Sequence, residues 1–254
     1  MTARLRETAI LTRRTLRHLT RSPDTIITSA LIPVALMLMF IYVFGGALAP
    51  SLPTASYLEY MLPGILLFTV GSGIVYTSVR LFSDLQGGLA ERFASLPISR
   101  AAPLWAHALT SLVGTLVPVG LVLLIAVGLG FRSPAGVGSW LAALGLLAAL
   151  VLALTWVAIL AGLGAKTVEG ASAFSYPILF LPFVSSAFVP TDTMPGPLRW
   201  FAEHQPVTAL VDALRQLWAG EGAGSDLWVS LAWCTGILVV AQTWAVVRYR
   251  RRLH

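Results

Sequence analysis

Charged side chains are scarce in this sequence. Asp, Glu, Lys and Arg make up 11% of its 254 residues, hydrophobic residues make up 57%, and the mean hydropathy is +0.81. A soluble domain usually carries about a quarter charged residues, because polar side chains must cover its surface. This composition argues against a soluble globule and indicates an integral membrane protein.

Cysteine and histidine are also rare. The single cysteine, Cys234, has no partner for an intrachain disulfide and cannot belong to a cysteine cluster for a metal ion. The four histidines, which are far apart in the sequence, are His18, His107, His204 and His254. His107 lies near the end of an apolar run, where we expect a hydrogen bond between helices, with a proton-relay group as the alternative.

Catalytic motifs are missing as well. The stretch GLGAKT at residues 162–167 resembles a phosphate-binding loop, but that motif needs glycine directly before the lysine, where this sequence has Ala165. No Ser/His/Asp set or pair of carboxylates is spaced for catalysis. The sequence therefore predicts a chain that is not an enzyme, hydrolyses no ATP by itself and binds no cofactor.

Six apolar segments are long enough for a membrane helix, which needs roughly 20 residues. They cover about residues 26–49, 58–82, 102–131, 140–165, 171–189 and 227–247. The first follows a basic lead and ends in ALA at residues 47–49, as a cleaved signal peptide does, but its apolar run exceeds the usual length of about 7–15 residues. We therefore expect a retained span and an all-α protein with six transmembrane helices.

Acidic residues are absent from the middle of all six segments. Proteins driven by ion gradients usually carry ionisable side chains inside their spans, where such groups are costly and persist mainly for function. In the second segment, Glu59 and Arg80 lie near the ends. The pattern argues against ion coupling, and an ion-gradient-driven secondary transporter or channel is the alternative function.

The basic residues are divided unequally between the two sides of the membrane that six spans define. Fourteen fall on the side of the termini and three on the other. The fourteen are Arg4, Arg6, Arg13, Arg14, Arg17, Arg21, Arg80, Arg92, Arg100, Lys166, Arg248, Arg250, Arg251 and Arg252, and the three are Arg132, Arg199 and Arg215. Cytoplasmic loops are rich in Lys and Arg, so we expect both termini in the cytoplasm. The sequence pI of about 10.1 then reflects topology and anionic head groups, and nucleic acid is not an expected partner.

Residues 1–24 form a basic lead before the membrane domain of residues 25–254. One helical face holds Leu5, Ala9, Thr12, Leu16 and Leu19, and another holds Arg6, Arg13, Arg17 and Arg21. This periodicity fits an amphipathic helix in the membrane interface, and a solvated basic arm that only sets topology fits equally well. We expect Ser22, Pro23 and Asp24 to break the helix before the first span.

The segment GGLAERFASLPISR, residues 87–100, is polar although it lies between two apolar runs. Apolar residues recur on one helical face at Leu85, Leu89, Phe93 and Leu96, and Pro97 ends the pattern. The spacing predicts a short amphipathic helix on the cytoplasmic side. It is either a docking helix for a cytoplasmic partner or a loop that satisfies the ends of two spans.

A second irregular region covers residues 190–220 on the outer side. Pro197 and Pro206 suit the first turn of a helix, and Gly220 suits a helix end. Trp200 and Trp218 suit the head-group level of a membrane. We expect a helical hairpin that dips into the outer leaflet, with an ordinary surface loop as the alternative.

Four segments, in order along nearly the whole chain, resemble the permease subunits of type 2 ABC exporters, especially the drug-resistance kind associated with daunorubicin producers. They are RSPD at residues 21–24, FIYVFGGAL at 40–48, ERFASLPISR at 91–100 and FVPTDTMPGPLRWFAEHQPVT at 188–208. The sequence departs from the pattern at EHQP, residues 203–206, where many relatives have an NP dipeptide.

The resemblance implies a multi-pass permease in a bacterial plasma membrane that exports a hydrophobic or amphipathic compound such as a drug, an antibiotic or a lipid-like molecule. Two permeases, identical or related, would pair and be served by two separate ABC ATPase subunits, which bind ATP and Mg²⁺. Residues 87–100 would be the coupling helix, whose contacts with the ATPase are Glu91, Arg92, Phe93, Leu96 and Arg100. The hairpin would be the extracellular gate, with Trp200, Glu203, Pro206 and Trp218.

Aromatic residues in three spans are candidates for the wall of the cargo path, because apolar ligands are held mainly by apolar and aromatic surface. They are Phe40, Phe44, Phe68, Tyr76, Phe174, Tyr176, Phe180 and Phe183; packing against lipid or other helices is the alternative. The fifth span, with its serines, is the candidate dimer seam, with contacts at Ser175, Phe180 and Ser186. Spans can bend at Pro33, Pro63, Pro118, Pro177 and Pro182.

Overall fold

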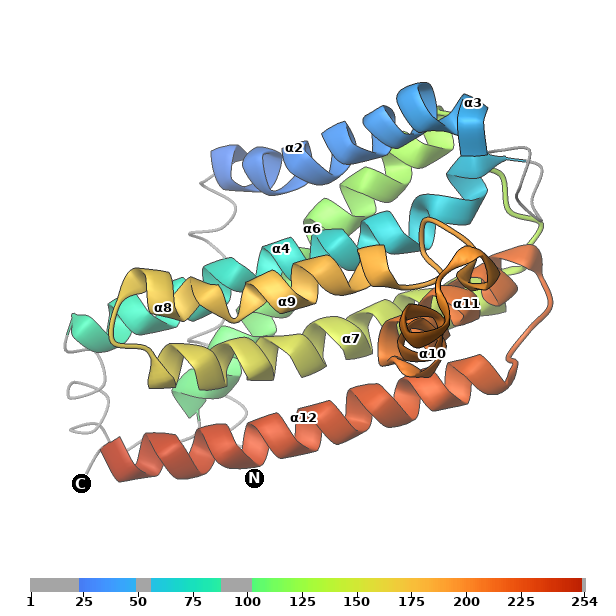
Figure 1. Ribbon diagram of the computed structural model, residues 1–254. Coiled ribbons are helices and arrows are strands. Elements are labelled where there is room, and N and C mark those ends of the chain that lie inside the picture. Colours follow the sequence, from blue (N-terminus) through green and yellow to red (C-terminus); the bar gives the residue numbers. More distant parts are fainter. Residues whose placement is uncertain (1–22, 49–55, 88–101, 253–254) are drawn as a thin grey trace.

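Four long helices make up most of the bundle (Figure 1). The structure, a computed structural model, describes residues 23–48, 56–87 and 102–252, and every regular element in these ranges is helical. The long helices are α4 (Tyr57–Gln86), α6 (Ala102–Gly128), α7 (Val137–Gly164) and α12 (Ser225–Arg252). Each is apolar and long enough to cross a membrane. The predicted all-α membrane architecture is confirmed, and these helices match four of the six expected spans to within a few residues.

The first apolar segment is a composite helix. It consists of α2 (Pro23–Met39), a π-helical turn η1 (Phe40–Phe44) and α3 (Gly45–Leu48). The helix begins at Pro23, within the expected break, because proline is well suited to a first helical position. The π-helical turn changes the register of the side chains that follow it, and such turns are frequent at functional sites. The composite helix packs on α4 and α6.

The predicted fifth span is divided into three short helices. They are α8 (Val168–Ala173), α9 (Ser175–Phe180) and the 3₁₀ turn η3 (Leu181–Val184), which follow one another along α4 (Figure 1). Pro177 and Pro182 each remove a backbone donor from this stretch. The hydroxyl of Ser175 donates to the carbonyl of Ser172 at 2.6 Å, which further favours a local break. The chain then becomes extended at Ser185.

Small residues on α4 allow its neighbours to approach closely. Gly64 and Gly71 lie two helical turns apart, and a Cβ added at Gly64 would lie 2.7 Å from the Cβ of Ala187. One further heptad along, Ser78 contacts α7, where a Cβ at Gly162 would lie 2.7 Å from the Ser78 carbonyl oxygen. Close packing over small residues is a common basis of helix association in membranes. It makes α4 the central helix of the bundle.

Two shorter helices cross one end of the bundle, and we call this end the α11 end (Figure 1). After the 3₁₀ turn η4 (Thr191–Thr193) come α10 (Gly196–His204) and α11 (Pro206–Ala219), and α11 packs on α4, α7 and α12. Pro197 lies in the first turn of α10, and Gly220 ends α11 with a φ of +80°. The expected pair of helices, with its starts and its end, is therefore confirmed.

The loop between α6 and α7 closes over α11. The hydroxyl of Ser133 donates to the carbonyl of Trp218 at 2.6 Å. The ring of Trp218 packs against Phe131 and Trp140, with centroid distances of 5.4 and 5.8 Å. Trp218 is only 4% exposed. It is thus an internal packing residue rather than the surface anchor that its position in the sequence indicated.

Candidate functional site

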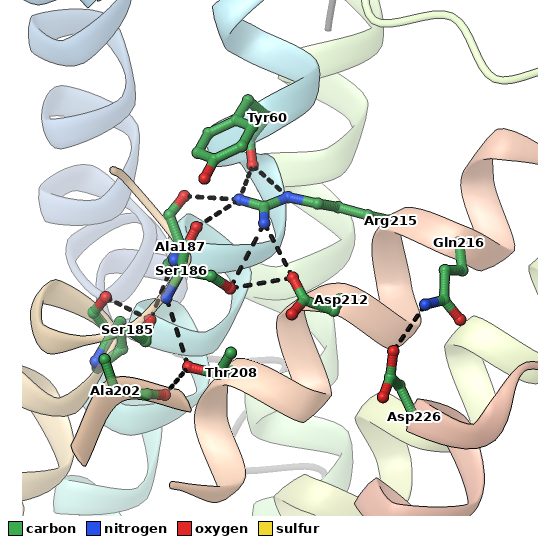
Figure 2. A network of polar contacts seen from close by, with 11 residues as sticks. Tyr60, Ser185, Ser186, Ala187, Ala202, Thr208, Asp212, Arg215, Gln216 and Asp226 are labelled. Atoms are coloured by element: carbon green, nitrogen blue, oxygen red, sulfur yellow. Dashed lines mark hydrogen bonds and ion pairs between the residues drawn. The ribbon is translucent and has the colours of Figure 1, made fainter. Parts of the chain in front are cut away.

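One arginine joins three separate elements at the α11 end (Figure 2). The Nη2 of Arg215 donates to the carbonyl oxygens of Tyr60 at 2.8 Å, Ser186 at 2.7 Å and Ala187 at 3.2 Å. Its Nε also donates to Tyr60, at 3.1 Å, and its Nη1 pairs with Asp212 at 3.0 Å. The guanidinium carbon lies 3.7 Å from the centre of the Tyr60 ring. We call this cluster the Arg215 network.

The local backbone explains why arginine is required at this position. Tyr60 is in the first turn of α4, while Ser186 and Ala187 lie in the turn that follows η3, so the carbonyls of these two residues are not part of a helix. Asp212 and Arg215 are three residues apart on α11 and therefore share a face. Only the planar fork of arginine offers five donors to such a spread of acceptors.

The Arg215–Asp212 pair is partly buried. Burial lowers the pKa of Arg215, and the neighbouring Tyr60 and Asp212 oppose this change. Burial likewise raises the pKa of Asp212, and Arg215 and the hydroxyl of Ser186, which donates to Asp212 at 3.0 Å, oppose it. Each charge is thus stabilised by the other.

Further hydrogen bonds fasten the hairpin to the chain around it (Figure 2). The backbone N–H of Ser186 donates to the hydroxyl of Thr208 at 3.4 Å. The side-chain amide of Gln205, between α10 and α11, donates to the carbonyl of Val184. On the other side of α11, the amide of Gln216 donates to Asp226 of α12 at 2.6 Å. The hairpin is therefore fixed both to the broken fifth segment and to the last helix.

Two cavities flank Arg215. One, of about 370 Å³, is lined by polar residues that include Asp192, Asp212 and Ser186. The other, of about 320 Å³, is lined by Glu59, Arg132 and Glu221 among others, and Arg215 lines both. Volumes of this size are at the lower end of those that hold small ligands. The Arg215 side chain thus stands between two polar openings at the α11 end.

An aromatic cluster adjoins the Arg215 network. Phe188, which follows the residues bound by Arg215, stacks on Phe40 at 4.8 Å and on Phe183 at 4.9 Å. Phe183 in turn contacts Phe68 at 6.0 Å and Phe180 at 6.4 Å, and Phe40 contacts Phe44 at 5.4 Å. Rings from η1, α4, α9 and η3 thus form one continuous group, which we call the aromatic cluster.

The aromatic cluster reaches the surface of the chain. Phe180 is 66% exposed, and Phe44 and Phe183 are also exposed, next to the exposed Tyr42 and Val43 of η1. An apolar face of this kind on a chain with membrane spans contacts either lipid or another protein. The face combines the first apolar segment with the fifth.

The comparisons with known proteins identify the family. The model of the family described as ABC-2 type transporter matches residues 6–218. The chain belongs to the ABC-2 type transporter family. It is 30% identical over 246 residues to the daunorubicin resistance ABC transporter permease protein DrrB1 of Streptomyces coeruleorubidus, a match that covers 94% of this chain and 86% of that protein.

Two further relatives of this ABC-2 permease have similar lengths. A probable doxorubicin resistance ABC transporter permease protein of Mycobacterium tuberculosis is 28% identical, over 96% of this chain and 88% of that protein. A putative transport permease of Cyanophora paradoxa is 29% identical, over 85% of this chain and 75% of that protein. The similarity therefore extends over nearly the whole permease, from the first apolar segment to the last.

The structure brings together five of the eight aromatic residues predicted for the cargo path. These five are Phe40, Phe44, Phe68, Phe180 and Phe183, which belong to the aromatic cluster. Tyr76 and Tyr176 are exposed, and neither they nor Phe174 makes a ring contact within the described ranges. Which of the eight contact cargo stays a prediction.

The three residues predicted for the dimer seam do not share one surface. Phe180 is exposed, whereas Ser175 and Ser186 are 2% and 7% exposed and bond within the chain. In this chain their hydroxyls serve the break in the fifth segment and the Arg215 network. Contact of the two serines with a second copy stays a prediction.

The remaining predicted residues divide between the described and undescribed parts of the chain. The coupling residues Glu91, Arg92, Phe93, Leu96 and Arg100 lie outside the described residues. In the hairpin, Trp200 is exposed and stacks on His204 at 4.9 Å, Glu203 pairs with Arg199 at 2.7 Å, and Pro206 begins α11.

His107 has the interhelical partner that the sequence led us to expect. Its Nε2 lies 3.3 Å from Asp84 Oδ2, so the pair joins α6 to α4.

Sequence reasoning missed Arg215, Asp212 and Phe188. A signal for the first two was present, because they form an Asp–Arg pair at i, i+3 on the polar face of an amphipathic helix.

Proposed function

We propose that this chain is the membrane-spanning permease subunit of an ATP-driven exporter, which moves a hydrophobic or amphipathic compound out of the cytoplasm or inner leaflet. The observation that carries the proposal is the match, over 94% of the chain, to a permease named for daunorubicin resistance. A second relative is named for doxorubicin resistance. The cargo class is therefore a planar aromatic drug or a similar amphipath, and the function is antibiotic resistance or secretion.

The proposed topology has six spans with both termini in the cytoplasm. Four spans are the long helices, and the other two are the shorter apolar segments Ser29–Phe44 and Val168–Val184. Arg248 lies in the last turns of α12, at the end of the bundle away from α11, as the excess of basic residues on the cytoplasmic side requires. The α11 end then faces the outside.

The proposed assembly pairs two permeases with two ABC ATPase subunits. ATP and Mg²⁺ are bound by the ATPases, and their closure pushes the coupling helix of residues 87–100, which directly follows α4. Because α4 is the central helix and its first turn is held by Arg215, a push on one end of α4 reaches the network at the other. The α10–α11 hairpin serves as the extracellular gate, and opening it requires the contacts of Arg215 to break.

The proposal is tested in vesicles that contain the chain and its ATPase. Inside-out vesicles should accumulate doxorubicin only with hydrolysable ATP, and dissipating the proton gradient should not stop the uptake. The purified chain alone should hydrolyse no ATP. Uptake driven by an imposed ion gradient without ATP would instead support the secondary transporter, since the spans hold Arg80 and the His107–Asp84 pair as ionisable groups.

Removing the proposed ATPase contacts should uncouple the complex. In the double variant Glu91→Ala/Phe93→Ala, we expect export to fall on the order of tenfold or more, as for loss of an interface hot spot, while membrane insertion is unchanged. Export and ATP hydrolysis are measured in the same vesicles. Ser95→Ala, on the polar side of the same segment, is the matched control. Export at the normal rate by the double variant would contradict the coupling assignment.

The exposed aromatic cluster is the proposed dimer seam. In a Cys234→Ala background, Phe180→Cys should be joined to a second copy by a short bifunctional maleimide, because Phe180 is exposed on this face. Ser175→Cys, five residues earlier in α9 and buried, should not be joined. Cross-linked dimers are counted by gel electrophoresis. Cross-linking of Ser175→Cys in the absence of cross-linking at Phe180→Cys would place the seam on another face.

A further inference from the structure

A small cavity with several polar residues in its lining lies between α2, α4 and α6, in the half of the bundle away from the α11 end. Its volume is about 80 Å³, and its lining includes Tyr76 and Arg80 from α4 and His107, Ser111 and Thr115 from α6. These segments are otherwise apolar enough to cross a membrane. Ionisable groups within membrane-spanning helices are costly and point to a function by default.

Arg80 lies inside α4 and is followed by further helix. Helix α4 continues to Gln86, six residues beyond Arg80, which is about 9 Å at 1.5 Å per residue. In the described part of the chain its guanidinium makes no hydrogen bond or ion pair. Asp84, four residues further along α4, contacts His107 instead, at 3.3 Å.

The wall of the cavity is fixed by hydroxyl groups that already have partners. Thr77 donates to Ser111 at 2.6 Å, and Ser111 bonds to Thr155 of α7 at 3.0 Å. Close contact of α4 and α6 closes one side, since a Cβ at Gly73 would lie 2.9 Å from Thr115. The guanidinium of Arg80 is therefore the main group available to bind a ligand in the cavity.

The size of the cavity limits what it holds. Drug-sized ligands occupy about 300–1,000 Å³, so about 80 Å³ admits only a few heavy atoms. An unpaired guanidinium favours a phosphate or carboxylate, which it binds through two parallel hydrogen bonds. The phenol of Tyr76, which is 51% exposed beside it, supplies a further donor.

We propose that this cavity binds the anionic head group of an amphipathic molecule, held by Arg80, while the apolar part of that molecule stays in the bilayer. The molecule is either a lipid of the inner leaflet or the exported compound itself. The second case rests on the proposed export function, and the first does not.

The test uses the complete complex in nanodiscs of phosphatidylcholine that contain a small fraction of photoactivatable phosphatidylglycerol. The wild type should capture the anionic probe on α4 or α6, and a photoactivatable phosphatidylcholine should be captured far less. Arg80→Gln should lower capture by about tenfold or more, as expected for loss of a charged hydrogen-bond donor. Arg248→Gln, an arginine at the same end of the bundle but outside the cavity lining, should capture like the wild type.

A second arm separates the two sources of the head group. In vesicles with ATP, outward movement of fluorescent phosphatidylglycerol would identify the bound molecule as cargo, and capture without movement would identify a resident lipid. Doxorubicin export is measured in the same vesicles, so loss of the export function is seen independently of lipid capture. If Arg80→Gln folds poorly, Arg80→Lys replaces it in the test. Because lysine keeps the charge, this variant should retain most of the capture. Capture by Arg80→Gln at the wild-type level, or equal capture of phosphatidylcholine, would overturn the proposal.

Discussion

Replacing Arg215 with methionine should abolish export and destabilise the permease. Methionine keeps the apolar stem but leaves the carbonyls of Tyr60, Ser186 and Ala187 without their donor, and Asp212 without its counter-charge. The Asp212 side chain is 36% exposed, so the loss comes mainly from the carbonyls, and leaving a buried acceptor without its donor costs roughly 1–3 kcal/mol. The free energy of unfolding should fall by about this amount, and the ends of α4 and the fifth segment that Arg215 joins should separate. Denaturation in detergent and drug uptake by vesicles measure the two effects.

Two control variants accompany this test. One keeps the charge at position 215 without the geometry of arginine, and the other removes an exposed arginine elsewhere. Arg215→Lys keeps the charge but offers no planar fork, so it should bind one or two of the acceptors and give an intermediate loss of both stability and export. Arg199→Gln removes an exposed pair with Glu203 on α10 and should change neither quantity measurably. If Arg215→Met behaved like Arg199→Gln, the Arg215 network would be neither the clamp of the fold nor part of the gate.

The long helices could be predicted because their signals are local. An apolar run of sufficient length, ended by glycine, proline or charge, defines α4, α6, α7 and α12 wherever the helices pack. Proline and glycine likewise define the ends of α10 and α11. The fifth segment differs, because the two prolines and the serine hydroxyls that divide it do not show in its hydropathy.

The candidate sites were harder to predict because they depend on which face of each helix meets its neighbour. Hydropathy identified Phe40 and Phe183 as residues in spans, but only the close approach over Gly64 and Gly71 brings their rings onto Phe188. Arg215 was counted as one of three outer charges, and its carbonyl acceptors lie 28 to 155 residues away in the sequence. The pair with Asp212 is a local signal, but no local pattern identifies these distant carbonyls.

The register between α4 and α7 depends on one glycine. A Cβ at Gly162 would lie 2.7 Å from the Ser78 carbonyl oxygen and 3.3 Å from its hydroxyl. Real Cβ atoms do not approach a backbone oxygen so closely, and a backbone atom cannot move without its helix. The side chain of Ser78 is itself fully buried, so the contact has no room to relax.

Gly162→Val should therefore separate α4 from α7 and inactivate the permease. Overpacking of this kind costs about 1–3 kcal/mol or more, and the displaced helix is the one that leads into the proposed coupling segment. The matched control is Gly145→Val on the same helix, where an added Cβ meets no atom within 4 Å. Because both variants introduce the same β-branched side chain into α7, a difference between them reports the contact with Ser78 and not helix propensity. We expect Gly145→Val to keep wild-type unfolding and export, and Gly162→Val to lose both; equal behaviour of the two variants would show that α4 and α7 are not packed at Ser78.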